Sequence, residues 1–305
     1  MEQPEFVEKI LIPVNRLEGD TIPVSAFLGR EDGSYPTETT KYEKRAVSIY
    51  VPDWDPEKCV QCNRCSFVCS HSVLRPTLLS MEQLDAAPEE MSYAKAIGYK
   101  KKFYAMGFSA LDCNGCGNCV DVCIAKEKAL TMKPLAAKQI EYEKCWDYMK
   151  DIELEDASEI NIHTVKGSQF LKPLFEFSVA CAGCGETPYA KLVTQLYGDR
   201  MVISASAGCA TVWSGSTPSV PYTKNRQGRG PAWGFSLFED NAEYGYGLHL
   251  GANAVRDIAV KKVKDALPIV TNTTLKTAME SWISGLSVSE GTFDRADALI
   301  EALEN

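Results

Sequence analysis

The chain has 305 residues, of which 45% are hydrophobic and 24% charged, so it can form a buried core and is not a disordered protein. Its formal net charge of −9 excludes a general nucleic-acid-binding surface, which needs clustered basic residues. The acidic start MEQPEFVEKILIPVNR does not resemble a signal peptide, and no run of about 18 apolar residues predicts a membrane span. Twelve cysteines in such a chain favour metal binding in a reducing cytoplasm over a secreted disulfide scaffold.

Four stretches of different texture follow one another along the chain. Residues 1–52 lack cysteine and carry turn signals, so we expect an N-terminal extension or linker with short strands, one of them at Arg45–Val51. Residues 53–146 hold nine of the twelve cysteines and are expected to form one domain. The acidic stretch 147–164 predicts a linker, and the longer apolar segments of 165–305 predict an α/β domain.

Within the last stretch, several segments have the signals of helices and strands. Thr187–Tyr197 is predicted to be a helix, with Thr187 as a possible N-cap. Met201–Ser204 is predicted to be a buried strand that leads into the small-residue loop Ala205–Gly208. Ser284–Asn305 is partly polar and amphipathic, and it predicts one more helical segment.

An internal repeat carries eight of the cysteines. The pattern C-x2-C-x2-C-x3-C begins at Cys59 and recurs at Cys113, at a shift of 54 residues. Such a loop aims three thiolates at one inorganic core, and in two-cluster ferredoxins the fourth cysteine ligates the other cluster. The repeat therefore predicts two [4Fe-4S] sites, one made by Cys59, Cys62, Cys65 and Cys123, and the other by Cys113, Cys116, Cys119 and Cys69.

The alternative for this repeat is structural zinc. Zinc sites commonly combine two distant C-x2-C pairs around one ion, whereas here three consecutive cysteines share the spacing, twice over. This difference favours iron–sulfur clusters. Ser70 and Ile124 stand where the bacterial ferredoxin run usually has proline, which affects the geometry of the loop and not ligation.

The remaining candidate residues give weaker signals. Cys181 and Cys184 form another C-x2-C pair, and Cys209 follows the strand predicted at Met201–Ser204. Three ligands are one short of a Cys₄ cluster, so the spacing fits a third cluster or a set of structural thiols equally well. Cys145 could supply a fourth ligand, but it lies in a different segment and is interpreted as a structural thiol. His71 is interpreted as a packing residue, with a hydrogen bond to a cluster sulfur as the alternative.

The order of these motifs resembles a known family. ACAGCGETPY (180–189) and ISASAGCATVWSGSTPSVPYTKNRQGRGPAWGFSLFEDNAEYGYG (203–247) follow the cysteine repeat, and SYPTETTKYEKRAVSIYVPDWDPEKC (34–59) leads into it. Over nearly its whole length the chain resembles pyruvate:ferredoxin (flavodoxin) oxidoreductase in its single-chain, homodimeric form. The resemblance implies an α+β / α/β fold: a ferredoxin-like domain with two [4Fe-4S] clusters, and then the first part of an α/β thiamine-diphosphate-binding domain.

The resemblance also implies site residues and partners. Cys181, Cys184 and Cys209 would ligate a third [4Fe-4S] cluster whose fourth ligand is absent from the chain, and Glu186 and Cys209 would line thiamine diphosphate with its Mg²⁺. The implied reaction is the oxidative decarboxylation of pyruvate to acetyl-CoA and CO₂, with ferredoxin or flavodoxin accepting the electrons. The complete enzyme would be a cytoplasmic homodimer that uses pyruvate and coenzyme A, with no nucleic acid or membrane as partner.

The chain also departs from the family pattern. The GDG motif that binds the diphosphate is absent, and Gly198–Arg200 is interpreted as a turn between helix and strand. The family's pyruvate-binding and cofactor-activating residues lie upstream of Met1, so no catalytic residue is expected within this chain. We therefore expect a central piece of a larger enzyme (a fragment, a truncated product or a split subunit) that is inactive alone. The alternative is a stand-alone iron–sulfur electron-transfer protein or subunit without catalysis of its own.

Overall fold

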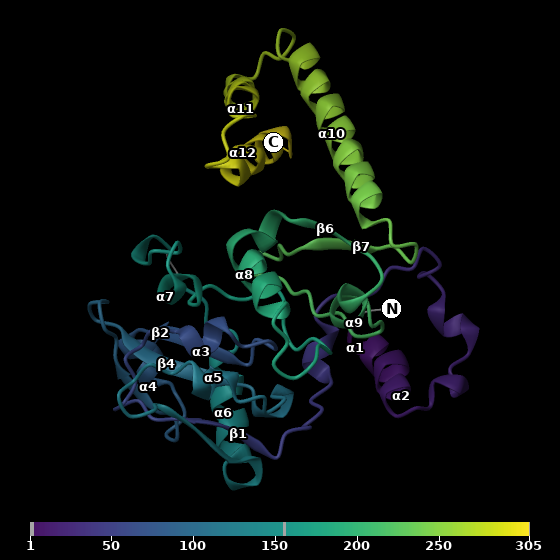
Figure 1. The fold of residues 1–305 in the computed structure, drawn as a ribbon. Coiled ribbons are helices and arrows are strands. Elements are labelled where there is room, and N and C mark those ends of the chain that lie inside the picture. Colours follow the sequence, from purple (N-terminus) through teal and green to yellow (C-terminus); the bar gives the residue numbers. More distant parts are fainter. Residues whose placement is uncertain (1–2, 155–156, 305) are drawn as a thin grey trace. The chain divides into compact units, whose positions relative to one another are not determined.

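The computed structural model describes residues 3–154 and 157–304 (Figure 1). Its contacts separate two compact units, Met1–Glu239 and Asp240–Asn305. The first unit mixes helices with small sheets, which in the described residues have two, three and two strands. Among the helices within the described ranges, none has the length and apolar character needed to cross a membrane.

The N-terminal segment is helical and irregular ahead of its first strand. α1 (Gln3–Phe6) and α2 (Ile12–Asn15) are joined by a π-helical turn, Val7–Leu11, which buries apolar side chains. Further along, Oγ1 of the buried Thr39 donates to the carbonyl of Pro218 at 2.8 Å. This bond fastens the segment to a much later part of the same unit.

The strand expected at Arg45–Val51 starts later than the alternation suggests. β1 spans Tyr50–Trp54, and the side chains of Val47 and Ile49 are exposed. Ala46 has φ +52°, a left-handed conformation that interrupts an extended backbone. The prediction was therefore wrong for the first part of this segment, where the backbone turns instead of pairing.

The cysteine-rich part consists of two interleaved halves. Its elements are β1, α3 (Arg64–Phe67), β2 (Leu74–Leu79), α4 (Met81–Asp85), β3 (Tyr93–Lys95), β4 (Phe103–Phe108), α5 (Asn118–Asp121), β5 (Leu130–Pro134) and α6 (Gln139–Met149). β1 pairs antiparallel with β5, and β2 pairs antiparallel with β4. A shift of 54 residues places β1 on β4 and makes β2 overlap β5. Each strand before one cysteine motif thus pairs with the strand after the other motif, which brings the two motifs together.

One hydrophobic core lies between these halves. Val51, Leu74, Tyr104 and Leu130, one from each of the four paired strands, are almost fully buried, and Trp146 of α6 packs onto the same core. Full burial of a side chain of this size contributes about 1.5–3 kcal/mol. The core therefore holds the cysteine motifs in place from both halves of the repeat.

The later part of the first unit contains α7 (Val165–Ser168), α8 (Thr187–Tyr197), β6 (Val202–Ala205), α9 (Cys209–Ser214) and β7 (Ala232–Phe235). The predicted helix Thr187–Tyr197 is confirmed, but its N-cap position is Glu186, and the hydroxyl of Thr187 is buried without a hydrogen-bond partner. β6 lies where a strand was expected and pairs in parallel with β7. Only Ala205 of β6 is buried, so the expectation of a buried strand was wrong.

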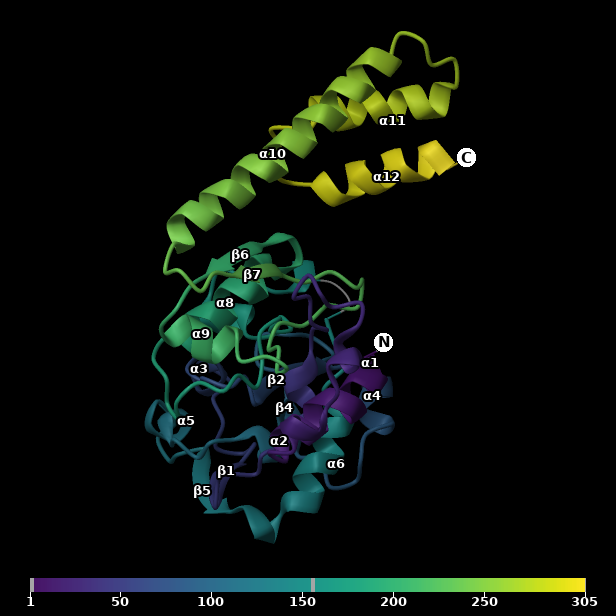
Figure 2. The same cartoon turned by 90° about the vertical axis from the view of Figure 1, so that its right-hand side faces the viewer.

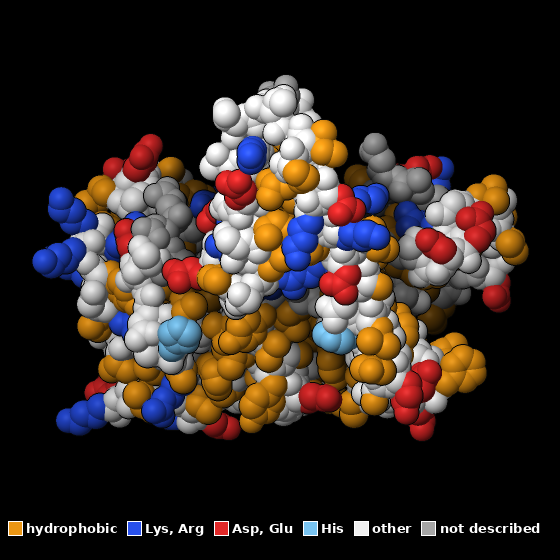
Figure 3. All heavy atoms as spheres, turned by 90° about the horizontal axis from the view of Figure 1, so that it is seen from above, with side chains coloured by type: hydrophobic (Ala, Val, Ile, Leu, Met, Phe, Trp, Pro, Cys, Tyr) orange, Lys and Arg blue, Asp and Glu red, His pale blue; other side chains and the backbone are white. Residues whose placement is uncertain are grey.

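The second unit is helical, with α10 (Asn241–Ala266), α11 (Thr273–Ser284) and α12 (Thr292–Glu304) (Figure 2). The helix expected at Ser284–Asn305 begins only at Thr292, after a turn that includes Gly291 at φ +67°; Asn305 lies outside the described residues. None of the described residues of α10 is buried. On the face shown in Figure 3, apolar side chains lie open beside acidic and basic ones.

Candidate iron–sulfur centres

The two cysteine loops have the same backbone conformation. Gln61 and Asn63 have φ +53° and +60°, and Gly115 and Gly117, 54 residues later, have φ +64° and +81°. These left-handed turns direct backbone N–H groups at sulfur. Gln61 N–H donates to Sγ of Cys59 at 3.3 Å, and Gly115 N–H donates to Sγ of Cys113 at 3.4 Å. Such N–H···S bonds stabilise thiolates, and they are one of the means by which proteins tune iron–sulfur clusters.

The first set of four cysteines surrounds a single small cavity. Cys59, Cys62 and Cys65 come from the first loop and Cys123 from the end of the second motif, and all four line this cavity. Trp54 also lines it, and its buried indole Nε1 makes no hydrogen bond of standard geometry with the described residues. Burial raises the pKa of the Cys59 thiol, and the Trp54 N–H acts in the opposite direction.

Burial makes these thiols poor acids in the absence of a positively charged partner. It raises the pKa of Cys65 to about 12, and the neighbouring Cys59, Cys62 and Cys123 add to the effect. It also raises the pKa of Cys113 to about 12. Iron binds the thiolate, so metal ligation supplies the positive charge that this crowded, buried set of sulfurs lacks.

The second set of four cysteines is brought together in the same crossed manner. Cys119 is buried, and the ionisable groups that act on it include Cys113 and Cys116 of its own loop and Cys69, which follows α3 of the other motif. Cys65 of the first set also acts on Cys119. The two sets are therefore immediate neighbours.

The donors of the first set lie on the wall of a cavity. Among residues 3–154 and 157–304, no group of three or more His, Cys, Asp or Glu side chains is arranged to hold one metal ion. A [4Fe-4S] cluster takes each thiolate on a different iron atom, so its four ligands stand around a volume and not around a point. The cavity with four thiols on its walls, a buried indole N–H and N–H···S bonds is consistent with that arrangement.

The third set of cysteines is more open. Cys181 and Cys209 are exposed and Cys184 is partly buried, with Glu186 N–H donating to Sγ of Cys184 at 3.4 Å. Oε2 of Glu186 accepts a 3.0 Å hydrogen bond from Nε1 of Trp213 on α9, the helix that begins at Cys209. The carboxylate therefore connects the two segments that carry these cysteines.

The segment after Cys69 holds the third set against the second. Ser70, which stands where ferredoxins usually have proline, donates its hydroxyl to the carbonyl of Cys184 at 2.8 Å. Nε2 of the buried His71 lies 2.9 Å from the carbonyl of Ala180 and 2.9 Å from Nδ2 of Asn114 in the second loop. Nε2 of His71 thus contacts a carbonyl and an amide, and burial lowers the pKa of the imidazole.

Gly183 allows a close approach between its loop and the second cysteine loop. Its φ is +72°, and a Cβ built on it would lie 3.4 Å from Cβ of Cys116 and 3.3 Å from Nδ2 of Asn118. A larger residue would be strained by its backbone conformation and crowded by the second loop. This contact places the backbone between Cys181 and Cys184 directly against a cysteine of the second set.

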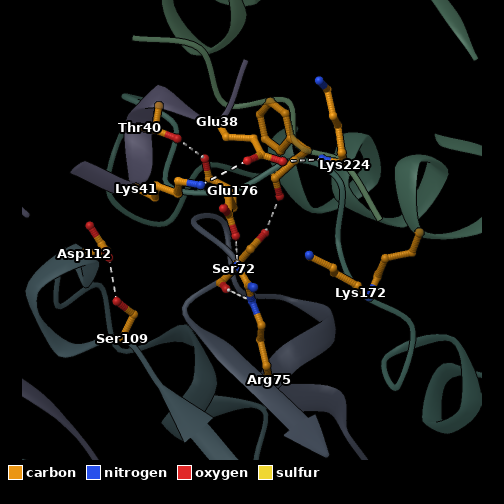
Figure 4. A network of polar contacts seen from close by, with 12 residues as sticks. Glu38, Thr40, Lys41, Ser72, Arg75, Ser109, Asp112, Lys172, Glu176 and Lys224 are labelled. Carbon is orange, nitrogen blue, oxygen red and sulfur yellow. Dashed lines mark hydrogen bonds and ion pairs between the residues drawn. The ribbon is translucent and has the colours of Figure 1, made fainter. Parts of the chain in front are cut away.

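A cavity of about 420 Å³ elsewhere in the unit is bounded by ion pairs. Its basic wall residues are each paired with a carboxylate: Lys41 with Glu38, Lys44 with Asp112, Arg75 with Glu176, Lys150 with Asp147 and Lys172 with Glu153. In Figure 4, Arg75 extends toward Glu176 and Ser72, and Lys41 toward Glu38. This network joins the N-terminal segment, β2 and the 172–224 region, and we interpret it as structural.

Sequence reasoning missed several residues around the cysteines. The main examples are Trp54 and Lys191. Cys145, by contrast, is interpreted as a structural thiol, and it packs partly buried beside Leu79 and Met149. Burial raises the pKa of Cys145 to about 11. The position of Trp54, at the end of β1 and five residues before Cys59, is a signal that could have been noticed; Lys191 has none, because its partners lie far away in sequence.

Comparisons with known proteins agree with the cysteine pattern. A family model described as a 4Fe-4S binding domain matches residues 51–74, and one described as a domain of unknown function matches residues 1–48. The chain is 50% identical over 298 residues to the pyruvate-flavodoxin oxidoreductase of Enterobacter agglomerans, covering 96% of this chain and 25% of that protein. It is 48% identical over 300 residues to the pyruvate:ferredoxin oxidoreductase of Moorella thermoacetica, covering 98% of this chain and 25% of that protein.

A third relative has a different electron acceptor in its name. The pyruvate dehydrogenase [NADP(+)] of Cryptosporidium parvum is 49% identical over 256 residues, covering 83% of this chain and 13% of that protein. The chain spans about a quarter of the length of the first two relatives. Over nearly its whole length the chain is thus homologous to a segment of the pyruvate:ferredoxin and pyruvate-flavodoxin oxidoreductases, and this segment includes a 4Fe-4S binding domain.

Proposed function

We propose that the chain carries the internal electron relay, and part of the thiamine diphosphate site, of an enzyme that oxidatively decarboxylates pyruvate to acetyl-CoA and CO₂. The observation that carries this proposal is the crossed arrangement of eight cysteines, in which four ligands drawn from both motifs line one cavity. Each [4Fe-4S] cluster accepts one electron at a time. The final acceptor would be ferredoxin or flavodoxin, and the complete enzyme would be a cytoplasmic homodimer that uses coenzyme A.

The ligand sets follow the crossed pattern. Cys59, Cys62, Cys65 and Cys123 hold one cluster, and Cys113, Cys116, Cys119 and Cys69 hold the other. The close contact of Gly183 with Cys116 supports an entry point for electrons at the second of these clusters, from a third cluster on Cys181, Cys184 and Cys209. The fourth ligand of that third cluster would come from outside these 305 residues.

The thiamine part of the proposal rests on fewer residues. Glu186 and Cys209 are exposed, and Glu186 is linked through Trp213 to the helix that Cys209 begins. Thiamine diphosphate with Mg²⁺ would serve as the electron sink of the decarboxylation when it is bound. In this chain, Glu186 would supply a carboxylate to it, whereas the sequence contains no GDG motif for the diphosphate.

Anaerobic reconstitution of the chain, followed by iron counting and thiamine diphosphate titration, tests this function. About 8 iron atoms per chain are expected for two complete clusters, and about 12 if the third also forms. Thiamine diphosphate binding that is lost in Glu186→Ala would support the enzyme proposal. About 8 iron atoms with no thiamine diphosphate binding would instead favour a stand-alone electron-transfer protein, and absence of iron would refute both.

A further inference from the structure

Lys191 is a buried cation, and within the described residues no carboxylate is among the charged groups that act on it. It lies in α8, six residues before the end of that helix, and only 1% of its surface is exposed. Its Nζ donates to the carbonyls of Ser66 and, at 3.2 Å, of Phe67, both in α3 of the first cysteine motif. A buried charge is costly unless an opposite charge compensates it, so an anionic partner is expected.

The position of these two carbonyls points to that partner, because Ser66 and Phe67 lie between Cys65 and Cys69 in the chain. The thiols of Cys69 and Cys65 act on Lys191, and so does Arg75, which has the same sign of charge. Cys65 belongs to the first proposed cluster and Cys69 to the second. A cluster with four thiolates carries net negative charge in both of its oxidation states, and this charge grows when an electron is added.

We propose that Lys191 is the shared counter-charge of the two clusters, and that its ammonium group raises the reduction potential of both. This inference rests on the proposed function, because it requires both clusters to be bound. Each cluster takes up one electron and passes it on, while Lys191 exchanges neither electron nor proton. Since burial excludes water from the ammonium group, its field is weakly screened and acts on both sites.

Lys166 provides a matched control. It too donates its Nζ to a backbone carbonyl, that of Ile97 at 2.7 Å, and it is influenced by two thiols of the first set, Cys59 and Cys62. Lys166 is, however, only partly buried. Solvent therefore screens its charge, and its removal is expected to change the potentials much less.

The test is an EPR-monitored redox titration of the reconstituted chain and its variants. Lys191→Gln keeps hydrogen-bond donors but removes the charge, Lys191→Arg keeps the charge, and Lys166→Gln is the control. We expect Lys191→Gln to shift both reduction equilibria toward the oxidised form by tenfold or more, equivalent to 59 mV for one electron, with Lys191→Arg and Lys166→Gln within threefold of the unmodified chain. Iron counts establish that each variant is loaded.

The outcomes separate the two proposals. Unchanged potentials in an iron-loaded Lys191→Gln variant would overturn the role of Lys191 and leave the proposed function intact. A shift of equal size in Lys191→Arg would also overturn it, because the perturbation would then be one of packing. Failure of the unmodified chain to bind iron would refute the proposed function itself. If Lys191→Gln does not load iron, the reduction potentials of iron-loaded Lys191→Met and Lys191→Arg are compared instead. A shift in Lys191→Met alone would support the role of Lys191, and equal potentials in the two variants would overturn it.

Discussion

The Arg75–Glu176 ion pair makes the most direct prediction about stability. Its side chains are only 13% and 8% exposed, and the Arg75 guanidinium also lies 4.8 Å from the ring centroid of Trp146 and 5.3 Å from that of Phe177. Removing one partner of a buried pair leaves the other charge uncompensated, at a cost of about 3–5 kcal/mol. Because Arg75 keeps its two aromatic contacts in Glu176→Ala, we expect the lower end, about 3 kcal/mol.

The exposed pair Lys144–Glu90 is the matched control, with side chains 54% and 43% exposed. Glu90→Ala should cost much less than Glu176→Ala, since water screens this pair and solvates the remaining charge. The assay is anaerobic urea unfolding of the iron-loaded chain, followed by circular dichroism. Equal losses in the two variants, or a loss in Glu176→Ala below about 1 kcal/mol, would refute the reasoning.

Three further predictions concern the surroundings of the cysteines. Ser70→Ala removes the hydrogen bond to Cys184 and should destabilise the chain by about 1 kcal/mol while speeding proteolysis at 180–186; unchanged proteolysis would contradict the role of Ser70. Trp54→Phe removes the indole N–H that acts on the Cys59 thiol and should lower the potential of the first cluster alone, as read by EPR. A shift in the potentials of both clusters would contradict this. Burial raises the pKa of Cys145 to about 11, so alkylation of this thiol should be slow at pH 7. The alkylation rate, measured by mass spectrometry, should increase about tenfold per pH unit until the pH nears that value, and a rate that does not depend on pH would contradict this.

The sequence predicts the parts of this structure that depend on local or repeated patterns. The helix Thr187–Tyr197 is confirmed over its length, although its N-cap is Glu186 and not Thr187. Its buried residues are Thr187, Lys191, Thr194 and Gln195, so the apolar face on which the prediction relied is not the one that packs inward. The 54-residue repeat predicts two equivalent halves, and the crossed cysteine sets follow from the ligation pattern of two-cluster ferredoxins and stay a prediction. The strands do cross between the halves, since β1 pairs with β5 and β2 with β4.

Other features depend on contacts between segments that are remote in sequence, so no local pattern reveals them. The bond from Lys191 to Ser66 joins residues 125 apart, and that from Ser70 to Cys184 joins residues 114 apart. The prediction of a strand at Arg45–Val51 was wrong for a different reason. The sequence does alternate between apolar and polar residues there, but the left-handed backbone at Ala46 interrupts an extended strand. Burial of Lys191 also contradicts the usual exposure of lysine, which a sequence pattern cannot anticipate.

Crossed ligation is the central claim, and EPR of reduced cysteine variants tests it most directly. If the fourth cysteine of each motif ligates the other cluster, Cys69→Ser should alter the same cluster signal as Cys113→Ser. Cys123→Ser should likewise alter the same signal as Cys59→Ser, and each variant should leave the other cluster unchanged. If Cys69→Ser instead altered the signal that Cys59→Ser alters, each motif would hold its own cluster, and crossed ligation would be wrong.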